Sequence, residues 1–94
     1  MIDVRQRAQG DPLEFDVVVG KGEDQTSHRV TISRAMLTRL TADTHAPERC
    51  IEAVFRFLLD REPKEAILRR FDVAVVGRYF PEFERELPRY LARS

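Results

Sequence analysis

The sequence is poor in the residues that build disulfide frameworks and metal sites. Its 94 residues include one cysteine, Cys50, and two histidines, His28 and His45. One cysteine excludes an intramolecular disulfide, and a structural zinc site generally needs four ligands with close pairwise spacing. We therefore expect no metal or other cofactor, and we interpret Cys50 as a small buried thiol rather than a reactive one.

The sequence also lacks an excess of charge. Sixteen Lys and Arg side chains balance sixteen Asp and Glu side chains, so the formal net charge is zero. Proteins that bind nucleic acid or anionic lipid usually carry a basic excess, because they must meet negatively charged phosphate groups. The balance disfavours both classes of partner.

Long apolar runs are missing as well. No run approaches the length that spans a bilayer, and the chain starts without the apolar segment of a secretory signal. Together with the single cysteine, these features predict a cytoplasmic protein that does not enter a membrane.

The length of the chain predicts one domain. Ninety-four residues with 43% hydrophobic content are enough for one modest core and too few for two. We expect residues 1–94 to form a single α+β domain. Its N-terminal β-hairpin would pack against a helical C-terminal part of four or five short to medium helices.

Alternation of apolar and polar residues predicts the hairpin. The period is two over residues 13–19 and again over 28–32, and turn-forming residues fill 20–27. The pattern predicts a β-hairpin over 13–33, while residues 1–11 are expected to be either a frayed start or a short edge strand. A hairpin is marginal alone, so helices must cover it or another strand, for example from a second copy, must join its edge.

Helical spacing follows over residues 34–92. Ser33 is expected to cap a short helix that ends near Thr41, and Pro47 suits the first position of a long helix. The long helix has an apolar stripe at i, i+3, i+4, i+7 and i+8. The stripe consists of Ile51, Val54, Phe55, Leu58 and Leu59.

Prolines divide the rest of the chain. Pro63 is expected to end the long helix and to start another, and Asp72 is expected to cap a further one. The segment 63–80 would then form a helix corner. Pro88 is expected to break the terminal helix, because it removes an interior hydrogen bond.

Residues 55–84 contain a recognisable series of short sequence segments. The block contains a helix ending in FLL, then REP, an ILxxFD segment and a YFPE segment. It resembles a family of small, uncharacterised bacterial proteins in which these segments occur in the same order. The resemblance covers about a third of the chain. It implies a bacterial source and a compact domain, and it implies no activity, ligand or partner.

Catalytic patterns are not recognisable. The Ser and Thr candidates lie in a strand or a loop with only His28 close in sequence, and nucleophilic catalysis needs a base and an orienting acid. Glu82, Glu84 and Glu86 alternate as expected of a solvated helix face. We expect a protein that is not an enzyme.

Aromatic and arginine side chains provide the leading functional hypothesis. Phe57 falls off the main stripe of the long helix, and Tyr79 lies in a C-terminal region with Arg78, Arg85 and Arg89. Such residues are enriched at protein-protein hot spots. We therefore expect a non-enzymatic protein-interaction or regulatory domain that acts through a protein partner or as a homodimer. The alternative that a second helix covers Phe57 stays open.

The second hypothesis is a small DNA- or RNA-binding protein. In it the helix corner at 63–80 is a helix-turn-helix, and Arg69, Arg70 and Arg78 contact phosphates. The proposed recognition helix offers almost no polar side chains to read base edges. Nucleic acid is therefore the less favoured partner.

Overall fold

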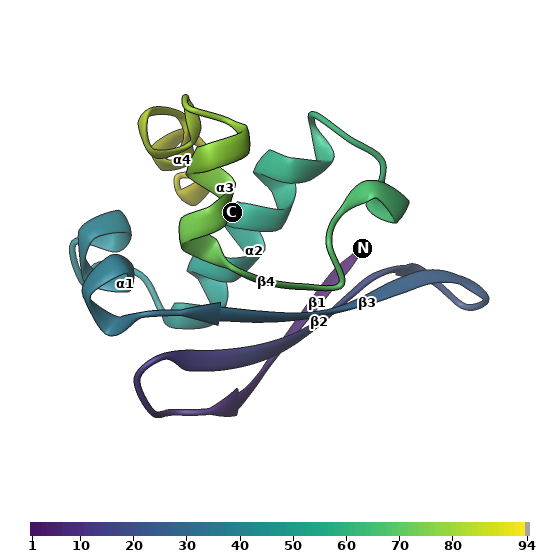
Figure 1. Ribbon diagram of the computed structural model, residues 1–94, viewed down its shortest axis with the longest axis horizontal. Helices are drawn as coiled ribbons and strands as arrows, with labels where there is room; N and C mark the ends of the chain where they lie inside the picture. The colour runs from purple at the N-terminus through teal and green to yellow at the C-terminus, as the bar shows by residue number, and fades with distance from the viewer. Residues whose placement is uncertain (94) are drawn as a thin grey trace.

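A computed structural model describes residues 1–93 of the chain. A four-stranded sheet carries the helices on one of its faces and leaves the other face open (Figure 1). The predicted α+β class, with a hairpin packed against a helical C-terminal part, is confirmed.

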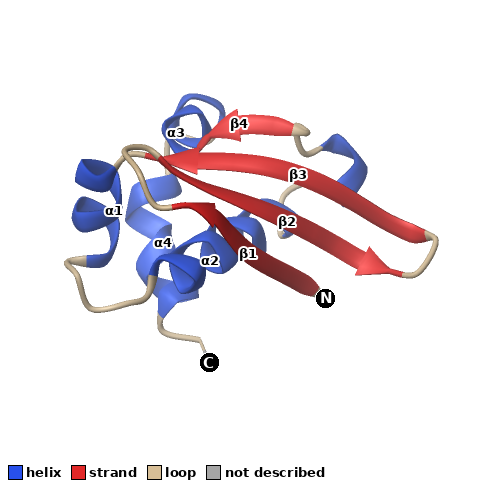
Figure 2. Ribbon diagram, turned by 90° about the horizontal axis from the view of Figure 1, so that it is seen from below, coloured by secondary structure: helices blue, strands red, loops and turns tan. Residues whose placement is uncertain are grey.

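The sheet is antiparallel except at one edge. Its strands are β1 (Ile2–Ala8), β2 (Leu13–Lys21), β3 (Asp24–Ile32) and β4 (Arg70–Asp72). They lie in the order β1-β2-β3-β4, and only β3 and β4 are parallel (Figure 2). The hairpin predicted over 13–33 is confirmed, with longer strands and a tighter turn than the sequence indicated. Gly20 lies at φ 103° with the backbone of Asp24 too close for a side chain, which explains a glycine inside β2.

The N-terminal segment is an ordered edge strand. Of the two expectations for residues 1–11, the edge strand is correct, and it is seven residues long. A bulge between Gln6 and Ala8 interrupts its register with β2.

The other regular elements of residues 1–93 are four helices and two short 3-10 turns. They are α1 (Arg34–Thr41), α2 (Pro47–Leu59), η1 (Lys64–Ala66), η2 (Val73–Val75), α3 (Val76–Tyr79) and α4 (Phe83–Leu91). The predicted cap is confirmed, because the Ser33 side chain accepts a hydrogen bond from the Met36 backbone N–H at 3.0 Å. Pro47 starts α2 as predicted.

The core lies between the sheet and the helices α2 and α4. Its largest fully buried side chains are Phe15, Phe55, Phe57, Phe83, Ile32, Ile51 and Leu87. The stripe predicted on α2 is buried except for Leu59, which is partly exposed. Helix α2 thus joins the sheet to α4, and its apolar face organises the core.

The helix corner predicted over 63–80 is wrong. This segment contains η1, then β4, and only then η2 and α3. The cause is the unpaired edge of β3: the Arg29 N–H donates to the Arg69 carbonyl at 2.7 Å, and Thr31 Oγ1 donates to Asp72 Oδ1 at 2.6 Å. Asp72 does cap the next segment, as predicted, because its side chain accepts from the Ala74 N–H.

The break predicted at Pro88 is also wrong. Helix α4 runs from Phe83 to Leu91 through Pro88. Leu87 and Leu91 are buried on either side of the proline, and this tertiary packing outweighs the loss of one backbone hydrogen bond.

Candidate functional site: an apolar groove

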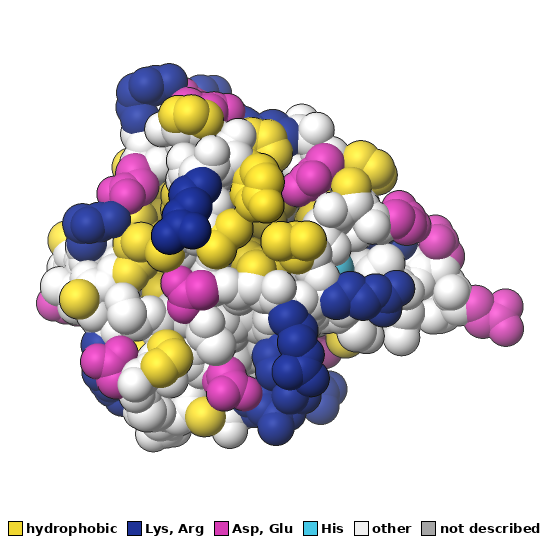
Figure 3. All heavy atoms as spheres, in the orientation of Figure 1, with side chains coloured by type: hydrophobic (Ala, Val, Ile, Leu, Met, Phe, Trp, Pro, Cys, Tyr) yellow, Lys and Arg dark blue, Asp and Glu magenta, His cyan; other side chains and the backbone are white. Residues whose placement is uncertain are grey.

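A groove lies where α2, η1, β4 and α3 meet. Its volume is about 220 Å³. It is lined by Leu58, Glu62, Ala66, Ile67, Leu68, Phe71, Val75, Val76, Tyr79 and Phe80. Nine of these ten residues are apolar or aromatic, and hydrophobic side chains gather at the centre of this face of the molecule (Figure 3).

The floor and the rim of the groove differ in exposure. Leu58, Ile67 and Val76 are buried and belong to the core, so the floor is fixed by the fold. On the rim, Leu68 is 50% exposed and Tyr79 is 68% exposed. Large apolar side chains exposed together over a buried apolar floor are typical of an interaction site.

The buried His28 holds one side of the rim. Its Nδ1 donates to the Leu68 carbonyl at 2.8 Å, and its Nε2 forms a hydrogen bond with the Thr26 hydroxyl, also at 2.8 Å. The ring packs edge-on against Phe55, with 5.3 Å between the ring centroids. His28 therefore anchors the segment that presents Leu68, and both of its ring nitrogens are used in doing so.

Phe57, expected on the interaction surface, is buried. Its exposed fraction is 0%, because the rings of Phe80, Phe83 and Tyr90 lie edge-on around it, with centroids 5.1 to 5.9 Å away. The alternative that a second helix covers Phe57 is correct, and that helix is α4.

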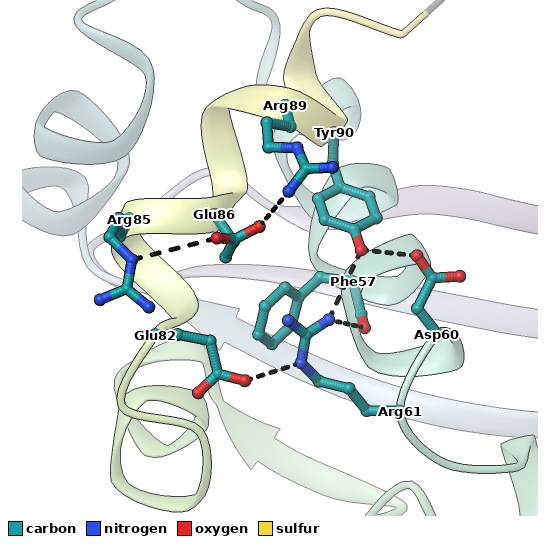
Figure 4. Close-up of polar contacts among 8 residues, drawn as sticks. All are labelled: Phe57, Asp60, Arg61, Glu82, Arg85, Glu86, Arg89 and Tyr90. Carbon is teal, nitrogen blue, oxygen red and sulfur yellow. Dashed lines mark hydrogen bonds and ion pairs between the residues drawn. The ribbon is translucent and has the colours of Figure 1, made fainter.

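Arg61 completes this cluster, in a role that no sequence pattern indicated. Its guanidinium carbon lies 3.7 Å from the centroid of the Phe57 ring, and Nε donates to Glu82 at 2.9 Å (Figure 4). Burial would lower the pKa of Arg61, but hydrogen bonds with Glu82 and Tyr90 raise it instead. The hydrogen bond from Arg61 in turn lowers the pKa of Glu82.

The remaining predicted residues fall into two places. Tyr79 and Arg78 are exposed on α3, where Tyr79 lines the groove. Arg85 and Arg89 are exposed on α4 and reach Glu86 at 3.9 Å and 2.6 Å (Figure 4). No residue of α4 lines the groove, so the five predicted residues do not form one surface.

The three arginines of the nucleic-acid hypothesis are also divided. Arg69 and Arg70 lie with Arg29 around a second hollow, of about 370 Å³, which Asp16 also lines. Arg78 does not line it. Burial would raise the pKa of Asp16, but hydrogen bonds from arginines, Arg29 among them, lower it. A carboxylate therefore occupies the arginine-rich hollow and offsets part of its positive charge.

Cys50 lies in the core rather than at a reactive site. It is a free, fully buried cysteine on α2, and burial raises the pKa of its thiol to about 11. Within residues 1–93, no group of three or more His, Cys, Asp or Glu side chains is placed to hold a metal ion. No helix in the same range is both long and apolar enough to cross a membrane.

Comparison with protein-family models, with curated proteins and with solved structures finds no match for this chain. The resemblance of residues 55–84 to a bacterial family stays an expectation from the sequence.

Proposed function

We propose that this chain is a non-enzymatic protein-interaction or regulatory domain that binds an apolar segment of a protein partner in its groove. The observation that carries the proposal is the exposure of Leu68 and Tyr79 beside a buried apolar floor. The partner would contact the domain at this groove.

The physical properties of the rim favour binding. Tyr79 offers a large contact area at a small cost in conformational entropy, because its side chain has two rotatable angles. Leu68 is held through its carbonyl by His28. A partner would therefore meet a groove whose floor and one side are already ordered, which reduces the entropy lost on association.

A cytoplasmic setting and a bacterial source belong to the same proposal. Cys50 is a free thiol protected by burial, which suits a reducing compartment. The nucleic-acid alternative is less well supported, since its helix corner is replaced by η1, β4, η2 and α3 within residues 63–80.

Capture of partners from a bacterial lysate, with and without nuclease, tests the proposal. We expect wild-type protein to retain a defined protein partner that is insensitive to nuclease. Tyr79→Asp and Leu68→Asp each place a charge on the apolar rim and should reduce recovery by about ten-fold or more. Arg85→Ala, an exposed change on α4, is the matched control and should leave recovery unchanged.

Binding of the identified partner to the purified variants then gives the decisive comparison. Equal affinity for wild type and for Tyr79→Asp would reject the groove as the site. Recovery that disappears after nuclease treatment would reject a protein partner and favour nucleic acid bound at the arginines of the second hollow, Arg29, Arg69 and Arg70.

A further inference from the structure

The outer edge of β1 is free to pair with another strand. Strand β1 is the last in the sheet, opposite to β4 (Figure 2). No backbone hydrogen bond within the described residues joins its outer side to another segment. Exposed edges of this kind are templates for pairing with another chain.

The alternation of hydrogen-bonded residues along β1 shows which backbone groups point away from β2. The Gly20 N–H donates to the Met1 carbonyl at 2.9 Å, and Ile2 lies opposite Val19 in the register. In an antiparallel ladder the bonded residues alternate. The backbone groups of Met1, Asp3 and Arg5 therefore point to β2, and those of the intervening Ile2, Val4 and Gln6 point away.

The outward residues centre on Val4. If a second β1 pairs antiparallel with Val4 opposite Val4, these two residues exchange both backbone hydrogen bonds, and so do Ile2 and Gln6 of the two copies. The bulge after Gln6 ends the regular segment. The usable edge is thus symmetric about Val4.

The charges of Asp3 and Arg5 also favour the register centred on Val4. With Val4 opposite Val4, Asp3 of each copy faces Arg5 of the other, in the positions where opposed side chains come closest. Both side chains lie on the open face, with exposed fractions of 52% and 81%. The two nearest registers that use the same outward backbone groups would place Asp3 opposite Asp3 or Arg5 opposite Arg5. Only the register centred on Val4 joins opposite charges at every such position.

Apolar contacts on the face that carries the helices also support this register. Ile2 and Val4 lie partly exposed at the margin of the core, on the side of the sheet that carries the helices. A second copy would place its own Val4 and Gln6 beside them. Exposed apolar surface at the sheet margin would then be covered.

We propose that two copies of this chain pair antiparallel along β1, centred on Val4, and join their sheets into one. The partner at this edge is a second copy, because the charge pattern of Asp3 and Arg5 complements itself. The inference does not rest on the groove, which involves β4 at the opposite edge of the sheet.

Charge-exchanged variants test the pairing and its register. Sedimentation equilibrium of wild-type protein tagged at the C-terminus should show a reversible dimer. Asp3→Arg makes both facing positions positive, and Arg5→Asp makes both negative. Each variant alone should dimerise about ten-fold more weakly or worse, because two attractive pairs become repulsive.

Mixing the two variants provides the internal control. In a heterodimer of Asp3→Arg with Arg5→Asp, every facing pair is again opposite in charge, so the mixture should recover wild-type affinity. The double variant Asp3→Arg/Arg5→Asp should also recover it within one chain. A monomeric wild type, single variants that dimerise normally, or a mixture that fails to pair while its components melt like wild type would each overturn the proposal.

Discussion

The aromatic side chains of Phe57 and Tyr79 have different surroundings. Phe57 is enclosed by three aromatic rings and the Arg61 guanidinium, whereas Tyr79 is 68% exposed on the rim of the groove. Arrangements of this kind stabilise a core through ring edges and a cation over a ring face. Phe57 therefore stabilises the fold, and Tyr79 is available for contact with a partner.

Truncation of the two aromatics should separate these roles. Phe57→Ala is expected to lower the free energy of unfolding by about 3 to 5 kcal/mol, because it leaves a cavity between α2 and α4. Tyr79→Ala, the matched control, should change it by less than about 0.5 kcal/mol. Urea denaturation followed by circular dichroism measures both. A loss below about 1 kcal/mol for Phe57→Ala would contradict the enclosure of this ring.

The sequence could predict burial only where a local period carried the information. The stripe from Ile51 to Leu58 on α2 follows helical spacing, and the structure confirms its burial. Phe57 lies off that stripe, so its exposure depends on where α4 packs, which is a non-local event. Leu68 falls in the helix that the sequence predicts after Pro63, but it lies between η1 and β4 in the structure. The role of Arg61 depends on its contacts with both Phe57 and Glu82, which no local pattern indicates.

Strand β4 also shows that a local sequence pattern cannot predict structure that depends on distant contacts. The apolar residues Ile67, Leu68 and Phe71 have a spacing that also fits a helix, and Pro63 supports a helix start. The unpaired edge of β3 decided the outcome, because its backbone groups needed partners. The hairpin and α2 were predictable because their patterns are long and regular, whereas β4 has only three residues.

Asp72 should be the residue that secures β4. Its carboxylate accepts from the Thr31 hydroxyl and from the Ala74 N–H, so it joins β4 both to β3 and to η2. Asp72→Ala is expected to lower the free energy of unfolding by about 1 to 3 kcal/mol. It should also speed hydrogen exchange at the Arg29 N–H, which donates to the Arg69 carbonyl beside β4.

Glu65→Ala provides the control for this experiment. Glu65 is exposed on η1, and a change there should leave the exchange of the Arg29 amide as in the wild type. Unchanged protection of that amide in Asp72→Ala would show that β4 is held without the carboxylate.

The two edges of the sheet lie at different surfaces of the molecule. Strand β4 and the segments around it form the groove, and β1 at the other edge presents unpaired backbone groups. The core between the sheet and α2 fixes both. A dimer through β1 would therefore carry two grooves, each able to bind its own partner.

Many of the acidic and basic side chains form ion pairs, and these pairs require ionised carboxylates. The pKa of Glu82 lies below its ordinary value of 4.5 because Arg61 donates to it, and the backbone adds to this effect. Against the opposing effect of burial, hydrogen bonds from Arg7 and Arg29 hold the pKa of Asp16 below its ordinary value of 3.8. Carboxylates with lowered pKa values bind protons more weakly in the folded than in the unfolded state.

Acid should therefore destabilise the fold partly through Glu82. A lowered folded pKa gives stability that is present above pH 4.5, the ordinary value, and is lost as the pH falls through the folded value. Glu82→Gln should be less stable than the wild type at neutral pH and lose less stability in acid, so the two curves converge. Urea denaturation between neutral and acidic pH measures this, with Glu23→Gln in the exposed hairpin turn as the control. Parallel curves for wild type and Glu82→Gln would show that the pair with Arg61 does not couple protonation to folding.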